Sequence, residues 1–159
     1  MIQGKRLTPD QALQKARHYC GYQERCHQEV KTKLFGFGLN RQEVDNALST
    51  LIEEDYLNEE RFAIQFAGGK FRMKGWGRSR IKMELKQRQV SEYCIKKAMK
   101  EIPDSVYFTT LEKLARTRWE SLKDEDKPSR LRKTQDHLIY KGYEWDLIKE
   151  TLKGLESQI

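Results

Sequence analysis

The chain has 159 residues, of which 37% are hydrophobic, 35% charged and 10% aromatic, and its formal net charge is +7. The aromatic content argues against a disordered chain, while the many charges argue against one thick core, so we expect several small apolar clusters. No stretch approaches the roughly 18 apolar residues of a transmembrane helix, and Met1 to Pro9 lacks the apolar run of a signal peptide. The three cysteines are an odd number without framework spacing, so we expect a reduced, cytoplasmic protein that does not associate with membranes.

Three stretches have the composition of leading helices. Thr8 is followed by proline, aspartate and glutamine, which supply a cap, a first helical residue and a capping-box partner. Asn58 is followed by two glutamates, whose charges suit the positive end of a helix dipole. The third stretch places apolar residues at helical spacing from Tyr107 to Trp119.

Behind each leading helix, one apolar pattern recurs with steps of four, five, five and four residues. A four-residue step keeps side chains on one helix face, and a five-residue step marks a short turn. Each segment therefore predicts a helix, a tight turn and a second helix. The apolar positions are Val30, Leu34, Leu39, Val44 and Leu48; then Ile81, Leu85, Val90, Ile95 and Met99; then Thr134, Leu138, Tyr143, Ile148 and Leu152, with Thr134 as the polar exception.

The residues at the predicted turns support this interpretation. Gly38 and Gly142 share one register, at which the end of a helix favours a left-handed residue, and Gln89 holds the same place in the middle segment. Asn40 and Ser91 also share a register and suit the cap of the following helix. We therefore predict an all-α fold of three tandem, helix-turn-helix-like three-helix repeats. The predicted repeats are residues 1–57 with a short N-terminal lead, 58–104 and 105–159.

The positive charge is concentrated in the middle of the chain. Residues 58–105 have a net charge of +6, against 0 for residues 1–57 and +1 for residues 106–159. Between Lys70 and Arg88 there are eight basic residues and one acidic residue. Gly75 and Gly77 flank Trp76, so we expect a loop there, followed by a helix from about Arg78.

Basic groups beside an aromatic ring suit phosphate contacts, base stacking or an acidic protein groove, and charge alone does not choose among these partners. The alternative is a solvated basic face with the tryptophan packed into the core. The candidate partner- or DNA-binding residues are Arg72, Lys74, Trp76, Arg78, Arg80, Lys82, Lys86 and Arg88.

Other kinds of site find little support. His18, Cys20, Cys26 and His27 are close in sequence, but they contain no CxxC pair, so we expect no metal site. No GxSxG, HExxH or Walker pattern occurs, so we expect no catalytic residues, no cofactor and no enzymatic activity. A sequence-specific DNA reader is disfavoured because acidic residues of the predicted helix 41–53 would repel phosphates.

The middle of the chain resembles the RecX family. Residues 55–63 read DYLNEERFA, residues 74–81 read KGWGRSRI, and Glu84-Leu85, Val90, Ile95 and Ala98 follow at the family's spacing. The resemblance extends over about residues 13–102 and is fainter afterwards. The chain departs from the family pattern at Asp55 and Gln89, where glycine is usual, and at Trp76, where proline or a small residue is common.

The resemblance implies a bacterial cytoplasmic regulator of recombination and DNA repair whose repeats form an elongated, curved row. Such a protein would bind the RecA filament, with single- or double-stranded DNA as a further contact. It would inhibit the ATPase, strand-exchange and co-protease activities of RecA, and it would be a monomer without catalytic residues. The alternative is an independent basic DNA- or RNA-binding helical module. The family-motif residues Tyr56, Leu57, Arg61 and Phe62 are expected to fix the junction between the first two repeats.

Overall fold

The computed structural model describes residues 6–157, which form nine α-helices and no strand. This confirms the predicted all-α class. The helices are α1 (Pro9–Tyr22), α2 (His27–Gly36), α3 (Arg41–Glu53), α4 (Glu59–Lys74), α5 (Arg78–Gln87), α6 (Glu92–Lys100), α7 (Asp104–Ser121), α8 (Lys127–Lys141) and α9 (Trp145–Glu156). The first five residues of the predicted N-terminal lead, and the last two residues of the chain, lie outside the described part.

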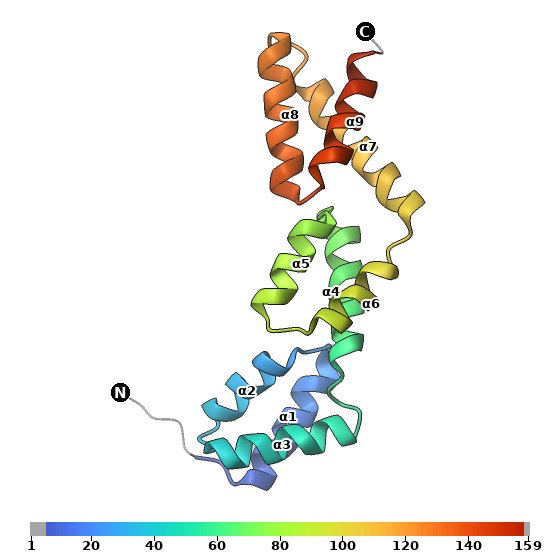
Figure 1. Ribbon diagram of the computed structural model, residues 1–159. Coiled ribbons are helices and arrows are strands. Elements are labelled where there is room, and N and C mark those ends of the chain that lie inside the picture. The colour runs from blue at the N-terminus through green and yellow to red at the C-terminus, as the bar shows by residue number, and fades with distance from the viewer. Residues whose placement is uncertain (1–5, 158–159) are drawn as a thin grey trace, which may run out of the picture.

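The helices pack in three consecutive groups of three, which we call the first (α1–α3), second (α4–α6) and third (α7–α9) units. The units follow one another in an elongated, slightly bowed row, with the two ends of the chain at opposite ends of the molecule (Figure 1). The middle helices α2, α5 and α8 lie along one side of this row (Figure 1).

The repeated apolar pattern forms the interior of the units. Every position of the pattern is buried except Met99, which is partly buried. The polar exception, Thr134, is also fully buried, and its hydroxyl donates to the carbonyl of Arg130 at 2.8 Å. That hydrogen bond satisfies the Thr134 hydroxyl, because serine and threonine can bond back one helical turn.

The predicted caps and turns are present. Thr8 and Gln11 form a capping box at the start of α1, and Asn40 and Glu43 form another at the start of α3. Gly38, Gln89 and Gly142, the three residues predicted to be left-handed, have φ values of 90°, 60° and 101°. Local sequence therefore determines where each helix pair turns.

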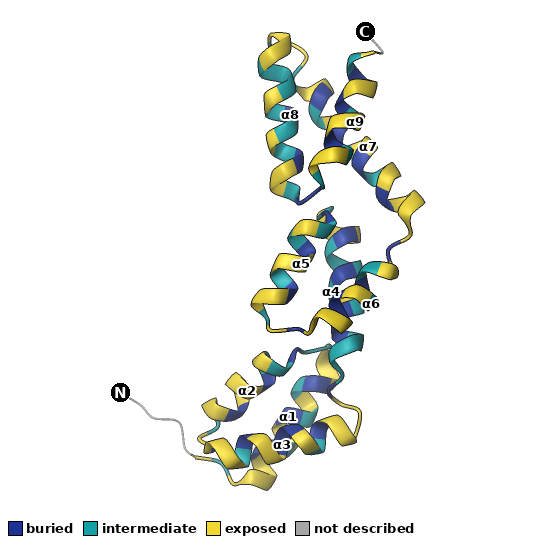
Figure 2. Cartoon of the chain, in the orientation of Figure 1, coloured by how far each residue is buried: buried dark blue, intermediate teal, exposed yellow. Residues whose placement is uncertain are grey.

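The apolar core is divided unequally among the units. One cluster of buried residues lies entirely within residues 12–57, in the first unit. A second cluster runs through both the second and the third unit and takes in one residue of the first unit, Cys26. In Figure 2 the buried residues accordingly follow the inner faces of the helices, while the outer face of α5 is largely exposed. The second and third units thus share a core that the first unit hardly joins.

Candidate partner-binding surface on the second unit

The predicted loop around Trp76 connects α4 to α5 and contacts the third unit. Gly75 ends α4 with a left-handed φ of 67°, and α5 begins at Arg78. The Gly77 amide donates to the carbonyl of Lys141 at 2.7 Å, and the Ser79 amide donates to the carbonyl of Gly142 at 3.0 Å. The carboxyl end of α8 therefore supplies acceptors to the amino end of α5, which has no acidic residue in its first turn.

The eight candidate residues divide into two sets of four. Trp76, Arg78, Arg80 and Arg88 are partly buried, whereas Arg72, Lys74, Lys82 and Lys86 are exposed. The first set makes contacts within the chain, and the second leaves its charges in solvent.

Arg78 connects the second unit to the third. Its side chain is only 17% exposed, and it forms ion pairs with Asp104 at 2.6 Å and with Glu144 at 3.4 Å. Its guanidinium carbon also lies 3.8 Å from the centre of the Tyr107 ring. Because its charge is matched and its ring contact is internal, Arg78 acts as a structural cross-link between units.

Arg80 and Trp76 form a stack beside the same junction. The Arg80 guanidinium lies between two aromatic rings, 4.2 Å from the centre of Trp76 and 4.8 Å from that of Tyr140. It also donates to the Tyr140 carbonyl at 3.2 Å. Trp76 packs edge-on against Phe66, with ring centres 6.4 Å apart, and remains partly exposed. Trp76 is thus partly buried and packs against the core, as the alternative prediction has it for this residue.

Arg88 is also paired within its own unit. It contacts the Glu84 carboxylate at 2.8 Å and lies over the Phe66 ring. By contrast, among residues 6–157 no ion pair involves Arg72, Lys74 or Lys82, and Lys86 makes a long one of 3.6 Å with Glu92. These four exposed cations are the ones that the structure leaves accessible to a partner.

The outer face of α5 carries two of these cations around an apolar side chain. Lys82 and Lys86 lie one helical turn apart and flank Met83, which is 50% exposed. We call the shallow depression formed by Ser79, Lys82, Met83, Lys86 and Gln87 the α5 surface. A flexible apolar side chain between two solvated ammonium groups suits contact with an acidic macromolecular surface better than enclosure of a small ligand.

Sequence patterns did not reveal the polar network behind this surface. Tyr107 is fully buried, and its hydroxyl accepts a hydrogen bond from the Arg78 amide at 3.0 Å while donating to the Glu144 carboxylate. Burial raises the pKa of Tyr107, and the Glu144 carboxylate raises it further, so the hydroxyl stays protonated. The only hint in the sequence was the absence of acidic residues at the start of α5, which implied that other groups serve that helix end.

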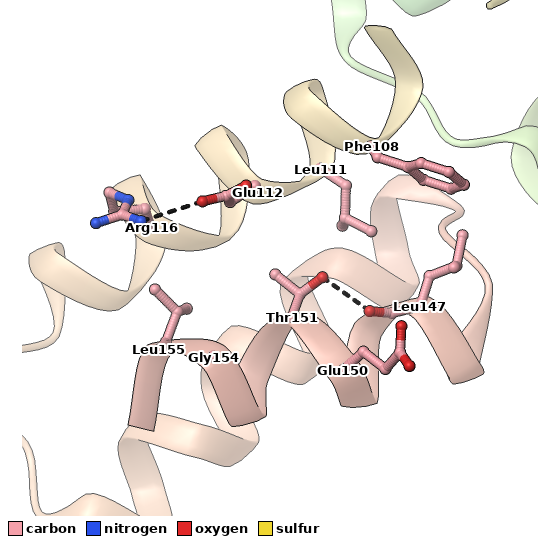
Figure 3. Close-up of a pocket in the computed structure, with 9 residues that line it drawn as sticks. All are labelled: Phe108, Leu111, Glu112, Arg116, Leu147, Glu150, Thr151, Gly154 and Leu155. Atoms are coloured by element: carbon pink, nitrogen blue, oxygen red, sulfur yellow. Dashed lines mark hydrogen bonds and ion pairs between the residues drawn. The ribbon is translucent and has the colours of Figure 1, made fainter. Parts of the chain in front are cut away.

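A separate groove lies in the third unit, between α7 and α9 (Figure 3). Its volume is about 370 Å³, and Phe108, Leu111, Leu147 and Leu155 supply its apolar lining. Two of its polar contacts are local to single helices: Arg116 pairs with Glu112 at 3.2 Å, and the Thr151 hydroxyl donates to the Leu147 carbonyl at 2.8 Å. None of the eight candidate residues lines it.

Residues 6–157 contain neither a metal-binding cluster nor a membrane-spanning helix. No group of three or more histidine, cysteine, aspartate or glutamate side chains is arranged to hold a metal ion. None of the helices described is both long enough and apolar enough to span a lipid bilayer.

Comparison with known proteins identifies the family. Residues 58–99 match the model of the second three-helix domain of RecX, and residues 105–152 match that of the third. The regulatory protein RecX of Clostridioides difficile is 26% identical over 144 residues, covering 91% of this chain and 68% of the relative. That of Prosthecochloris aestuarii is 27% identical over 144 residues, covering 91% and 93%.

Solved structures show the same fold. The crystal structure of RecX from Lactobacillus salivarius superposes with a TM-score of 0.84 at 20% identity, covering 93% of this chain and 96% of that one. A second crystal structure, of a regulatory protein RecX, gives a TM-score of 0.82 at 19% identity. Since the two domain models together match more than half of the chain, this protein belongs to the RecX family of regulatory proteins.

Proposed function

We propose that this protein is a negative modulator of the RecA recombinase, which binds the RecA–DNA filament and inhibits its ATPase, strand-exchange and co-protease activities. Membership of the RecX regulatory family is the observation that carries the proposal. In this proposal the protein is a non-enzymatic, cytoplasmic monomer. Its domains are residues 1–57, 58–104 and 105–159.

The contact surface that we propose is the exposed half of the candidate set, namely Arg72, Lys74, Lys82 and Lys86, together with Met83 of the α5 surface. A cation already paired in the folded chain would have to break that pair before it could bind a partner, which offsets much of the gain. For this reason we leave Arg78, Arg80 and Arg88 out of the proposed surface and assign them, with Trp76, to the support of α5.

The proposed mechanism is a shift of the filament equilibrium. A ligand shifts an equilibrium only if it binds the two states with unequal affinity. An elongated row of three units offers contacts that are far apart, so it would bind best where neighbouring filament subunits hold a fixed spacing (Figure 1). Restraint of the filament in that spacing would slow the subunit rearrangements that ATP hydrolysis and strand exchange require.

A RecA ATPase assay on single-stranded DNA tests both the function and the surface. The unmodified protein should inhibit hydrolysis, and the double variant Lys82→Glu, Lys86→Glu should inhibit about tenfold more weakly, since it turns two attractive contacts into repulsive ones. The matched control is Lys96→Glu, Lys100→Glu, which makes the same charge change one helical turn apart on exposed positions of α6. The control should inhibit like the unmodified protein.

The outcomes separate the two parts of the proposal. No inhibition by the unmodified protein contradicts RecA modulation itself. Equal inhibition by the α5 and α6 variants contradicts the surface and leaves the function standing.

The excess charge of +6 in residues 58–105 also favours a second candidate, independent binding of DNA or RNA. Titration of labelled single-stranded DNA without RecA tests it. Direct phosphate binding should weaken steeply between about 50 and 200 mM salt, because each neutralised phosphate releases counterions. Tight, salt-sensitive binding to bare DNA that the α5 variant abolishes would favour this candidate.

A further inference from the structure

The two connections between units differ in their backbone freedom. The first joint is the connection between Leu57 and Asn58, and the second joint is that between Ile102 and Pro103. Leu57 is buried in the core of the first unit, while the Asn58 side chain accepts the Arg61 amide at 2.9 Å and caps α4 of the second unit. At the second joint, Ile102 lies in the shared core and the ring of Pro103 restricts φ. Rotation between units is therefore freer at the first joint.

More apolar surface is buried across the second joint than across the first. Across the second joint, Phe71 stacks on Tyr107 with ring centres 5.8 Å apart, inside a buried cluster that runs through both the second and the third unit. Across the first joint, Cys26 is the only described residue of the first unit that joins the core of the other two. Because the hydrophobic effect scales with the apolar area removed from water, the second joint is much the stronger.

Hydrogen bonding shows the same contrast. Backbone amides of Gly77 and Ser79 bond directly to backbone carbonyls of the third unit. No such backbone bond between residues 6–57 and 58–157 occurs in the structure. The hydrogen bonds and ion pairs across the first joint, among these described residues, all involve Arg61.

Arg61 bridges the first joint by four acceptors. From the first turn of α4 its guanidinium donates to the Glu24 carboxylate, to the Asp55 carboxylate at 3.2 Å, and to the carbonyls of Asp55 at 2.9 Å and Tyr56 at 3.5 Å. Asp55 is left-handed, with φ of 62°, a conformation that costs a non-glycine residue about 1 kcal/mol or more. The same side chain thus pairs the two units and stabilises a strained residue next to the connection.

An open cleft beside the joint leaves room for motion. Its volume is about 520 Å³, with Glu24 and Glu29 of the first unit on one wall and Lys70 and Arg88 of the second on the other. The second carboxylate oxygen of Glu24 is buried and has no hydrogen-bond partner. A buried oxygen without a hydrogen-bond partner costs free energy. The observed arrangement of the two units therefore leaves one polar group at the joint unsatisfied.

We infer that the chain moves as two bodies, in which the first unit rotates about the Leu57–Asn58 connection while the second and third units stay together, and that Arg61 holds the first joint. The inference rests on the contacts at the two joints and does not depend on the proposed function. The Arg61 and Glu24 side chains are 33% and 20% exposed, so salt should screen their attraction and widen the range of angles between the units.

Double electron–electron resonance between pairs of spin labels tests the inference, because it measures the distribution of distances between the two labels. Ser49→Cys on α3 with Lys96→Cys on α6 spans the first joint, and Lys96→Cys with Lys153→Cys on α9 spans the second. All three positions are exposed, whereas the native cysteines are buried, and the unmodified protein labelled in parallel corrects for their reaction. The comparison is made at about 50 mM and about 1 M salt, where the screening length falls from over 10 Å to about 3 Å.

The Arg61→Gln variant and high salt should each broaden or shift the distance distribution across the first joint, because each weakens the bridge that holds the two units at one angle. The distribution across the second joint should not change. Arg116→Gln is the matched control, because it removes an arginine paired with Glu112 inside one unit. Glu24→Gln weakens the same bridge from the other side and serves if Arg61→Gln loses helix content by circular dichroism.

Two results would overturn the inference. One is a first-joint distribution that stays unchanged in high salt and in both bridge variants. The other is equal broadening at the two joints, which would show that the second and third units do not form one body.

Discussion

Gly77 and Gly142 lie backbone against backbone where the second unit meets the third. A Cβ atom added to Gly77 would be 2.4 Å from the carbonyl carbon and oxygen of Gly142, and one added to Gly142 would be 2.3 Å from the Cβ of Arg80. These separations are far below van der Waals contact and involve atoms that cannot swing aside. The close approach is what allows the carbonyl groups at the end of α8 to accept the amides of Gly77 and Ser79.

The Gly77→Ala substitution should therefore destabilise the protein by about 1–3 kcal/mol, because the added methyl group forces the two turns apart. The matched control is Gly69→Ala inside α4, where an added Cβ meets nothing within 4 Å. In that control the free energy of unfolding should rise by about 0.5–1 kcal/mol, since alanine is more favourable than glycine in the interior of a helix. Urea unfolding of both variants measures the difference, and equal midpoints would contradict the packing argument.

Gln89 occupies a position that suits glycine better. Its φ of 60° is left-handed, like that of Gly38 and Gly142 in the same register of the other units. The Gln89→Gly variant should be more stable by about 0.5–1 kcal/mol, because relief of the left-handed strain exceeds the entropy that glycine loses on folding. In the control Gln14→Gly, at an exposed position in the middle of α1, the free energy of unfolding should instead fall by about 1 kcal/mol. A loss of thermal stability in Gln89→Gly would contradict this assignment.

The buried hydroxyl of Tyr107 should be essential to the second joint. The Tyr107→Phe variant would leave the Arg78 amide and one Glu144 oxygen without their present partner, at a cost of about 1–3 kcal/mol. Tyr93→Phe on α6 removes the same atom from a side chain that is 63% exposed, and it should change stability little. Chemical denaturation that showed the same stability for the two variants would argue against the network.

His137 should make the protein less stable in mild acid. Burial, followed by the charges of Arg118 and Lys141, lowers its pKa below the ordinary value of 6.5. As pH falls through 6.5 the unfolded chain therefore takes up a proton before the folded chain does, and stability decreases until the folded state is protonated as well. Above that range the contribution is constant.

The His137→Gln variant should lose this part of the pH dependence, which unfolding curves between about pH 5 and 8 can measure. His18→Gln, at an exposed position of α1, should retain it. Nuclear magnetic resonance titration of the His137 ring checks the cause directly. A His137 pKa at or above 6.5 would remove the explanation.

Local features of the fold were predictable because they depend on nearest neighbours along the chain. The spacing of the apolar pattern that begins at Val30, and that recurs from Ile81 and from Thr134, indicates which helix faces are buried. A side-chain cap such as Asn40 bonds to an amide within the same helical turn, so its partner is close in sequence. A left-handed turn residue depends on the conformation of a single residue at the end of a helix. Gln89 is left-handed although glutamine disfavours a positive φ. It stands at the turn position that Gly38 and Gly142 occupy in the other two units, and the turn there requires that conformation.

The three-helix repeat, the concentration of positive charge in the second unit and the family can all be read from the order of residues along the chain. Which of those charges remain available to a partner depends on how the folded units pack. Arg78 and Lys82 are one helical turn apart on α5 and have the same charge, yet Arg78 pairs with Asp104 and Glu144 of the third unit while Lys82 faces solvent. The carboxylates that make this distinction are 26 and 66 residues away from Arg78 along the chain, and no local pattern encodes a meeting at that separation.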